Sequence, residues 1–190
     1  MVNRYSCRIM ANERPRSYRL PLQTGYADPR IAPYDAALEE AALRLIDVVA
    51  PLDLELHFVP KPSNLSIARF VRHLVWGDTM WVPRLIETPI PGSLEAACAD
   101  GALGLFVQPP EVNGTARELV DLIRRLRSEF TTPALKRVVS IDNPIPGDRG
   151  PETVEKALIH LLWHWTYHSG QVGILRELAG SDYTWTFEAR

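Results

Sequence analysis

Apolar residues recur three or four positions apart in four stretches of the chain, which is the spacing of amphipathic helices. These stretches cover residues 33–50, 63–85, 115–130 and 151–178. The third has the clearest start, because Thr115 and Glu118 stand at the spacing of a capping box. Its apolar stripe leaves Arg124, Arg125 and Arg127 for the solvent-exposed face of the helix. The pattern predicts an all-α protein that folds as a four-helix bundle.

The segments between these stretches are long and rich in proline and glycine. Residues 88–113 and 140–150 form the two longest connections, and residues 1–32 carry turn-forming residues without a helical pattern. We therefore expect an irregular N-terminal arm over residues 1–32 and a single bundle domain over residues 33–190.

Composition and charge narrow the range of functions. The chain has 190 residues, of which 46% are hydrophobic and 23% charged, as is typical of a globular protein. Its net charge of −2 creates no basic field, so we expect no nucleic-acid partner. No apolar run approaches the roughly 20 residues that cross a bilayer, and the first residues lack the apolar core of a secretory signal. With only two cysteines, the chain is predicted to be cytoplasmic and to have no membrane partner.

Three of the five histidines lie four residues apart on the last predicted helix. Neighbours at this spacing, such as His164 and His168, can hold one divalent ion about 2.0–2.1 Å from each nitrogen. His160 and His168 are roughly 12 Å apart along a regular helix, so all three cannot bind the same ion. A third ligand must come from another helix, and His73 within the second apolar stretch is the natural candidate. A single histidine on an apolar face is more often a packed core residue, so the histidines alone leave both interpretations open.

Several neighbours of these histidines also have two interpretations. Gln171 either orients a ligand or is an ordinary helix residue, while Trp76 and Tyr167 either line a pocket above the metal or belong to the core. Asp78 is a partner of the ligands, a general base or, as is commoner for an aspartate, a solvent-facing carboxylate. The sequences HExxH, Glu-x-x-His, G-x-S-x-G and the Walker A loop do not occur, which excludes the enzyme classes that they mark.

The segment HWTYHSGQVGILREL, residues 164–178, resembles the C-terminal helix of the DinB-like superfamily. The family pattern is H-x-x-x-H, an arginine or serine, Gly-Gln and an apolar residue, followed by Leu-Arg-x-Leu. The segment SIARFVRHLVWGDTMWV, residues 66–82, resembles the second helix of the same family. Together they extend the resemblance over roughly residues 33–180 and imply a four-helix bundle with up-down-down-up connectivity.

The resemblance also implies a metal site and a range of activities. A divalent metal, commonly zinc or nickel, would be held by His73, His164 and His168, with His160 behind these ligands. Characterised relatives include S-transferases that use low-molecular-weight thiols and a maleylpyruvate isomerase. We therefore expect a metal-dependent enzyme acting on a small-molecule substrate, either a thiol-dependent S-transferase or a hydrolase, whose catalytic residues the sequence does not identify. The alternative is a non-catalytic metal-binding or stress-response protein with a structural or ligand-sensing metal, and the resemblance allows a homodimer in either case.

Overall fold

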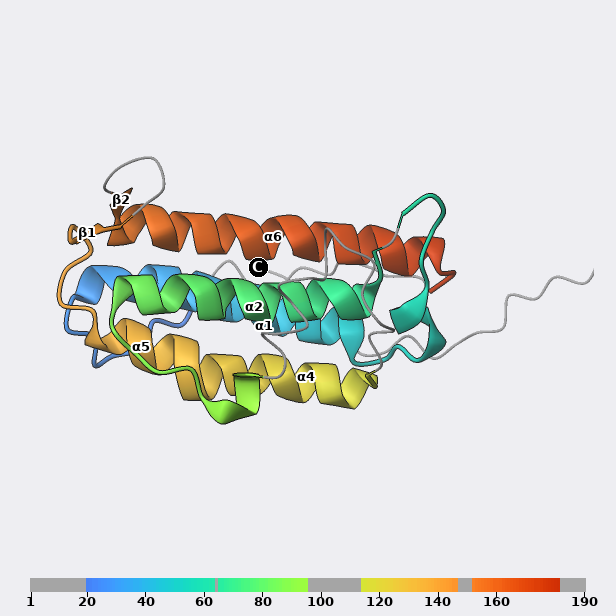
Figure 1. The fold of residues 1–190 in the computed structure, drawn as a ribbon, viewed down its shortest axis with the longest axis horizontal. Coiled ribbons are helices and arrows are strands. Elements are labelled where there is room, and N and C mark those ends of the chain that lie inside the picture. Colours follow the sequence, from blue (N-terminus) through green and yellow to red (C-terminus); the bar gives the residue numbers. More distant parts are fainter. Residues whose placement is uncertain (1–19, 64, 96–113, 147–151, 182–190) are drawn as a thin grey trace, which may run out of the picture.

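The fold was analysed in a computed structural model, which describes residues 20–63, 65–95, 114–146 and 152–181. Four long helical segments lie side by side within this part of the chain (Figure 1). The prediction of a helical bundle is therefore confirmed, with one short pair of strands added. The longer elements are α1 (Ala32–Val49), α2 (Ile67–Leu85), α4 (Ala116–Arg125), the π-helix η3 (Leu126–Thr131), α5 (Thr132–Arg137) and α6 (Val154–Leu178). The shorter ones are the 3₁₀ helices η1 (Pro29–Ile31) and η2 (Leu54–His57) and the antiparallel strands β1 (Pro144–Ile145) and β2 (Glu152–Thr153).

The first and last long helices run in the same direction. The Tyr34 hydroxyl near the start of α1 donates to Glu155 near the start of α6, over 2.8 Å. At the other end, Arg176 of α6 donates to the backbone oxygen of Val48 in α1, over 3.2 Å. Figure 1 shows α2 and the continuous segment α4–η3–α5 running the opposite way, so the directions along the chain are up, down, down and up.

The apolar core lies between the four segments. Helix α6 packs against both α1 and α2, and α4 packs against the same two helices from the other side. Each large apolar side chain that is buried in this way stabilises the fold by about 1.5–3 kcal/mol. Core side chains that are almost fully buried include Leu38, Leu45, Phe70, Leu74, Leu119, Ile123, Phe130, Leu158 and Leu161.

The third helical segment starts as predicted but does not continue as a regular helix. Thr115 and Glu118 form the expected capping box, with the Thr115 backbone N–H donating to the Glu118 carboxylate over 2.7 Å. Five-residue π-turns then begin at residue 126. The expectation that Arg127 faces solvent is wrong: this side chain is buried and donates to the carboxylates of Asp35 and Glu39 on α1. Charge pairing across the bundle, which the pattern along one helix does not show, brings it inside.

The second and fourth helical segments begin later than the periodicity suggests. Ser66, not Ser63, caps α2 by accepting a hydrogen bond from the backbone of Arg69. Helix α6 begins at Val154. Thr153 caps it, because its hydroxyl accepts a hydrogen bond from the backbone N–H of Lys156. The two strands just before it are two residues each, too short for any alternation of apolar residues to predict them.

The residues immediately before α1 pack onto the bundle. Ala27 donates its backbone N–H to Lys136 at the end of α5, and the Asp28 carboxylate accepts from the backbone of Ile141 over 2.8 Å. Ile31 is fully buried. The predicted arm over 1–32 therefore contributes to the core near its end, while residues 1–19 lie outside the described part. The predicted division at residue 32 stays a prediction.

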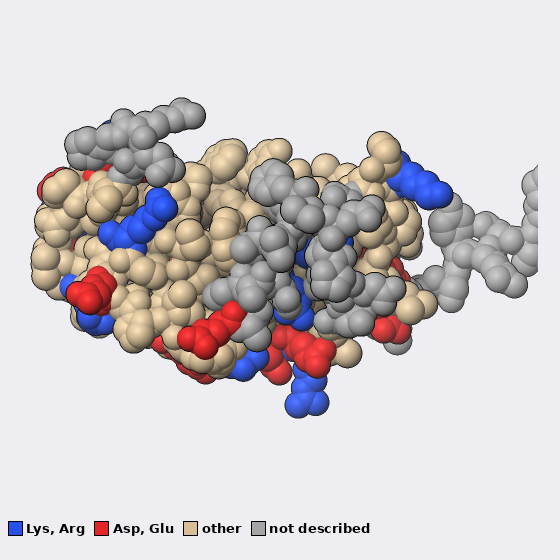
Figure 2. Space-filling model, viewed as in Figure 1, with Lys and Arg blue, Asp and Glu red and all other residues tan. Residues whose placement is uncertain are grey.

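The surface carries charges of both signs. On the face shown in Figure 2, acidic and basic side chains are intermixed without a large region of one sign. No helix among the described residues combines the length and the apolar character that a membrane span requires.

Candidate metal centre

Three histidines from two antiparallel helices converge in the structure. His73 comes from α2, and His164 and His168 lie one turn apart on α6. All three side chains are buried, each less than 10% exposed, and one ligand atom from each lies within 4.8 Å of the others. Two nitrogens bound to one tetrahedral zinc ion stand about 3.3 Å apart. The 2.9 Å between Nε2 of His73 and Nε2 of His164 is close to that separation, so small rotations of the rings suffice to hold an ion.

A buried carboxylate fixes the two helices against each other beside this cluster. Asp78 of α2 accepts a 2.7 Å hydrogen bond from the indole of Trp165 on α6 and a 2.6 Å bond from the hydroxyl of Thr131 in η3. The expectation that Asp78 faces solvent is wrong, because the residue is fully buried. Burial raises the pKa of Asp78, and the two donors act in the opposite direction by stabilising its charge. Its two hydrogen-bond donors in the described part of the chain are an indole and a hydroxyl, and neither belongs to a histidine.

Gln171 orients one of the three imidazoles. Its amide oxygen lies 2.6 Å from Nδ1 of His168. An amide oxygen can only accept, so Nδ1 of His168 carries the proton and its Nε2 keeps a free lone pair. A hydrogen bond of this kind behind a metal-binding histidine fixes both the tautomer and the angle of the ring. This is the geometry expected if Gln171 orients a metal ligand and is not merely an ordinary helix residue.

A glycine that the sequence analysis did not single out makes room for another of the imidazoles. A Cβ at Gly77 of α2 would stand 2.6 Å from Cε1 and 2.9 Å from Nδ1 of His164, closer than atoms can approach. A glycine inside a strongly helical pattern often marks such a close approach, and this signal was present in the sequence. On the same side of the ring, Nδ1 of His164 is buried and has no hydrogen-bond partner among the described residues.

The environment favours the neutral form of His164 and His168. Burial, together with repulsion from His73 and His168, lowers the pKa of His164 to about 3. Burial also lowers the pKa of His168, and the hydrogen bond to Gln171 partly offsets this effect. A histidine must be neutral to bind a metal, so these pKa values favour ligation at neutral pH. The group found among the described residues contains no carboxylate, and three neutral ligands leave a divalent ion its full charge and an open position.

Aromatic rings surround the three histidines. Trp76 stacks on His73, with 5.3 Å between ring centroids, and His160 stacks on His164 at 6.1 Å. Tyr167 meets the edge of His168 at 5.2 Å and is half exposed. The predicted neighbours are thus in contact with the cluster, apart from Asp78. Their roles, and that of the three histidines as ligands, are inferred from this geometry.

A helical bundle with three imidazoles on two antiparallel helices is the arrangement expected of a DinB-like metal-binding protein. The family model described as Mycothiol-S-transferase matches residues 34–180, most of the chain. The chain belongs to this family, which is DinB/YfiT-like, and the resemblance drawn from the sequence is confirmed. It is also similar to the protein YkkA of Bacillus subtilis (strain 168), described as uncharacterized, with 23% identity over 156 residues. That match covers 78% of this chain and 87% of YkkA.

Proposed function

We propose that the protein is a divalent-metal-dependent S-transferase that uses a low-molecular-weight thiol. His73, His164 and His168 are the proposed ligands, and zinc or nickel is the proposed metal. The observation that carries the proposal is the convergence of three buried imidazoles on one point within a chain of the Mycothiol-S-transferase family. A cytoplasmic location, a homodimer and the absence of nucleic-acid and membrane partners stay predictions.

The residues present fit such a metal. The donor set is all nitrogen, which suits zinc and nickel, and its lone pairs are made available by burial and by Gln171. A bound ion would supply a Lewis acid that binds sulfur and favours the thiolate over the thiol at neutral pH. In the transfer itself the thiol loses its proton and the sulfur forms a bond to an electrophilic carbon. The leaving group departs with the electron pair of the bond that breaks.

The side chains around the histidines would bind and orient the two substrates. Trp163 and Tyr167 stack on each other on α6, with 5.2 Å between ring centroids, and both are about half exposed. Exposed aromatic rings beside a buried polar cluster provide a flat apolar surface for an organic substrate. We therefore place the electrophilic acceptor along this part of α6, with the thiol sulfur directed toward the three histidines.

The position of the cluster favours a catalytic metal over a structural one. The apolar core is formed by side chains from all four helical segments, and Asp78 holds α2 against α6 without a metal. A structural zinc site, in contrast, usually supplies much of the folding free energy of a small core. We therefore infer that the fold forms without the ion, as expected for a site that serves substrates.

The test combines metal content and thiol transfer. Elemental analysis of the purified protein should find about one divalent transition metal per chain, and this metal should be lost in H164A and H168A. His57, exposed on η2, provides the matched control H57A, which should keep the metal. The wild type, but neither cluster variant, should then conjugate mycothiol to a fluorogenic electrophile, with glutathione and cysteine as comparison thiols. A protein that binds no metal after reconstitution, or transfers thiols equally well without its cluster, would refute the proposal.

A further inference from the structure

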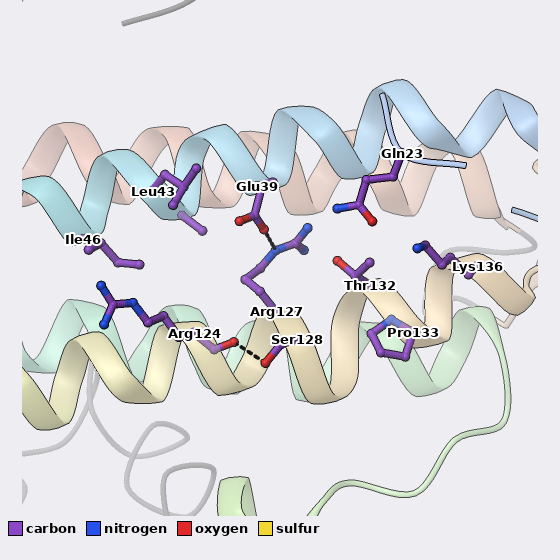
Figure 3. Close-up of a pocket in the computed structure, with 11 residues that line it drawn as sticks. Gln23, Glu39, Leu43, Ile46, Arg124, Arg127, Ser128, Thr132, Pro133 and Lys136 are labelled. Carbon is purple, nitrogen blue, oxygen red and sulfur yellow. Dashed lines mark hydrogen bonds and ion pairs between the residues drawn. The ribbon is translucent and has the colours of Figure 1, made fainter. Parts of the chain in front are cut away.

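A pocket lies on the side of the bundle formed by α1 and the segment α4–η3–α5, whereas the three histidines lie on α2 and α6. Its volume is about 560 Å³, within the range of small-molecule sites. Figure 3 shows its polar side chains lying between the two walls, with Gln23 and Glu39 on the α1 side. The apolar part of the lining comprises Ala42, Leu43, Ile46 and Pro133.

The polar part of this pocket is rich in cations. Arg124, Arg127 and Lys136 line it, against the single carboxylate of Glu39. Arg124 is largely exposed and lies 3.7 Å from Asp121, a loose surface pair of small energetic weight. The ammonium of Lys136 lies 5.6 Å from the centre of the Tyr26 ring. The lining therefore carries an excess of positive charge beside an apolar surface.

Arg127, which lines the pocket, is held in place by hydrogen bonds to α1. Its Nε donates to Glu39 over 3.0 Å and its NH2 group donates to the carboxylate and backbone oxygen of Asp35. Its third nitrogen, NH1, is buried and has no hydrogen-bond partner among the described residues. A buried donor without an acceptor is destabilising, so NH1 keeps a hydrogen-bonding capacity that the described residues do not use.

The wall of the pocket opposite α1 includes the π-helix η3. The π-helix η3 includes Arg127 and ends at Thr131, and π-turns are frequent at functional sites. The hydroxyls of Ser128 and Thr132 already donate to the backbone of Arg124 and to Asp35. Apart from the amide of Gln23, the side-chain donors left for a ligand are cationic, which favours a negatively charged ligand.

We infer that this pocket binds a small organic acid, with its carboxylate held by Arg124, Arg127 and Lys136 and its apolar body against α1. This inference does not depend on the proposed function, because the pocket shares no residue with the histidine cluster. A carboxylate suits the planar guanidinium groups, and the apolar wall formed by Leu43 and Ile46 suits a short aliphatic or aromatic body.

The test is a titration of the purified full-length protein with sodium hexanoate, followed by the backbone amide signals in NMR spectra. Signals from α1, η3 and α5 should shift in a saturable manner, with a Kd of about 1 mM or tighter, while hexanol, which lacks the charge, should bind more weakly. Arg124 is exposed and Lys136 is partly exposed, which allows the variants R124Q and K136Q, each of which should bind hexanoate about tenfold more weakly. R117Q, on the solvent side of α4, is the matched control and should bind like the wild type.

Four further outcomes decide the question. Unchanged binding in H164A, which lacks a histidine of the other cluster, would support two separate sites. Equal binding of hexanoate and hexanol, or wild-type affinity in both R124Q and K136Q, would overturn the inference. Inorganic phosphate binding as tightly as hexanoate would overturn the assignment of an organic acid, because the apolar wall would then contribute nothing.

Discussion

The substitution G77A tests whether the close approach of α2 to His164 shapes the metal site. The added Cβ would stand 2.6 Å from Cε1 of His164, whereas carbon atoms in contact are about 3.5–4.0 Å apart. The ring must therefore move by about 1 Å, or the two helices must separate by a similar distance. Metal–ligand distances tolerate only about 0.2 Å, so the displaced imidazole can no longer share an ion with His73 and His168.

The effect of G77A on the stability of the metal-free protein should be small. Alanine is favoured over glycine inside a helix by about 0.8–1.0 kcal/mol, which offsets part of the strain from moving the ring. We therefore expect the metal-free G77A protein to unfold at nearly the same temperature as the metal-free wild type. Its metal affinity should fall by at least 10- to 100-fold, the range for changes that disturb the orientation of a ligand.

The assay is competition with a chromophoric chelator, combined with thermal unfolding followed by circular dichroism in excess chelator. The matched control is G173A on α6, where the same substitution meets nothing within 4 Å. G173A should keep wild-type metal affinity and gain slightly in stability. Wild-type affinity in G77A would refute the reasoning, because it would show that His164 does not need its observed position to bind the metal.

Three further predictions concern residues around the cluster and near the N-terminal end of the bundle. Q171A removes the acceptor for His168 and should weaken metal binding about 10- to 100-fold while leaving the unfolding temperature nearly unchanged; equal affinity would contradict the orienting role. D78N turns an amide N–H group toward one of the two buried donors, Trp165 or Thr131, and should lower the free energy of unfolding by about 1–3 kcal/mol in urea titrations. An unchanged free energy of unfolding would count against these two hydrogen bonds to Asp78. The pKa of Asp28 lies below its usual range because Arg30 and a backbone amide donate to the carboxylate, so its contribution to stability is present above about pH 4 and is lost as the pH falls further. D28N should therefore flatten the acid side of the stability profile, and an unchanged acid limb would show that Asp28 does not contribute to it.

The helices and two of the three histidine positions follow directly from local sequence patterns. The periodicity of apolar residues locates four helical segments, and the capping residues Thr115 and Glu118 mark the start of the third. The four-residue spacing of His164 and His168 places them on one face, since that relation depends only on the geometry of a helix. His73 was assigned from its apolar neighbours and from the family resemblance, and the structure brings it to the same point.

Features that depend on contacts between helices were predicted wrongly or missed. Arg127 and Asp78 are charged, and a charged residue met in a sequence is most often exposed. Both are buried because their partners come from other segments, Asp35 in one case and Thr131 and Trp165 in the other. The π-turns at 126–131 have no distinct pattern either, because one wider turn changes the spacing of apolar residues by a single position.

The hydrogen bonds to Asp78 have a consequence for how the protein would acquire the proposed metal. Because they join α2, α6 and η3 through protein groups alone, the three imidazoles come together as soon as the chain has folded. Folding and loading of the proposed metal would then be separate events, and the ion could leave and return without unfolding the bundle. A folded molecule would exchange its ion with the metals present in its surroundings throughout its lifetime. Occupancy would therefore follow the supply of each metal in the cell rather than the conditions at the time of synthesis.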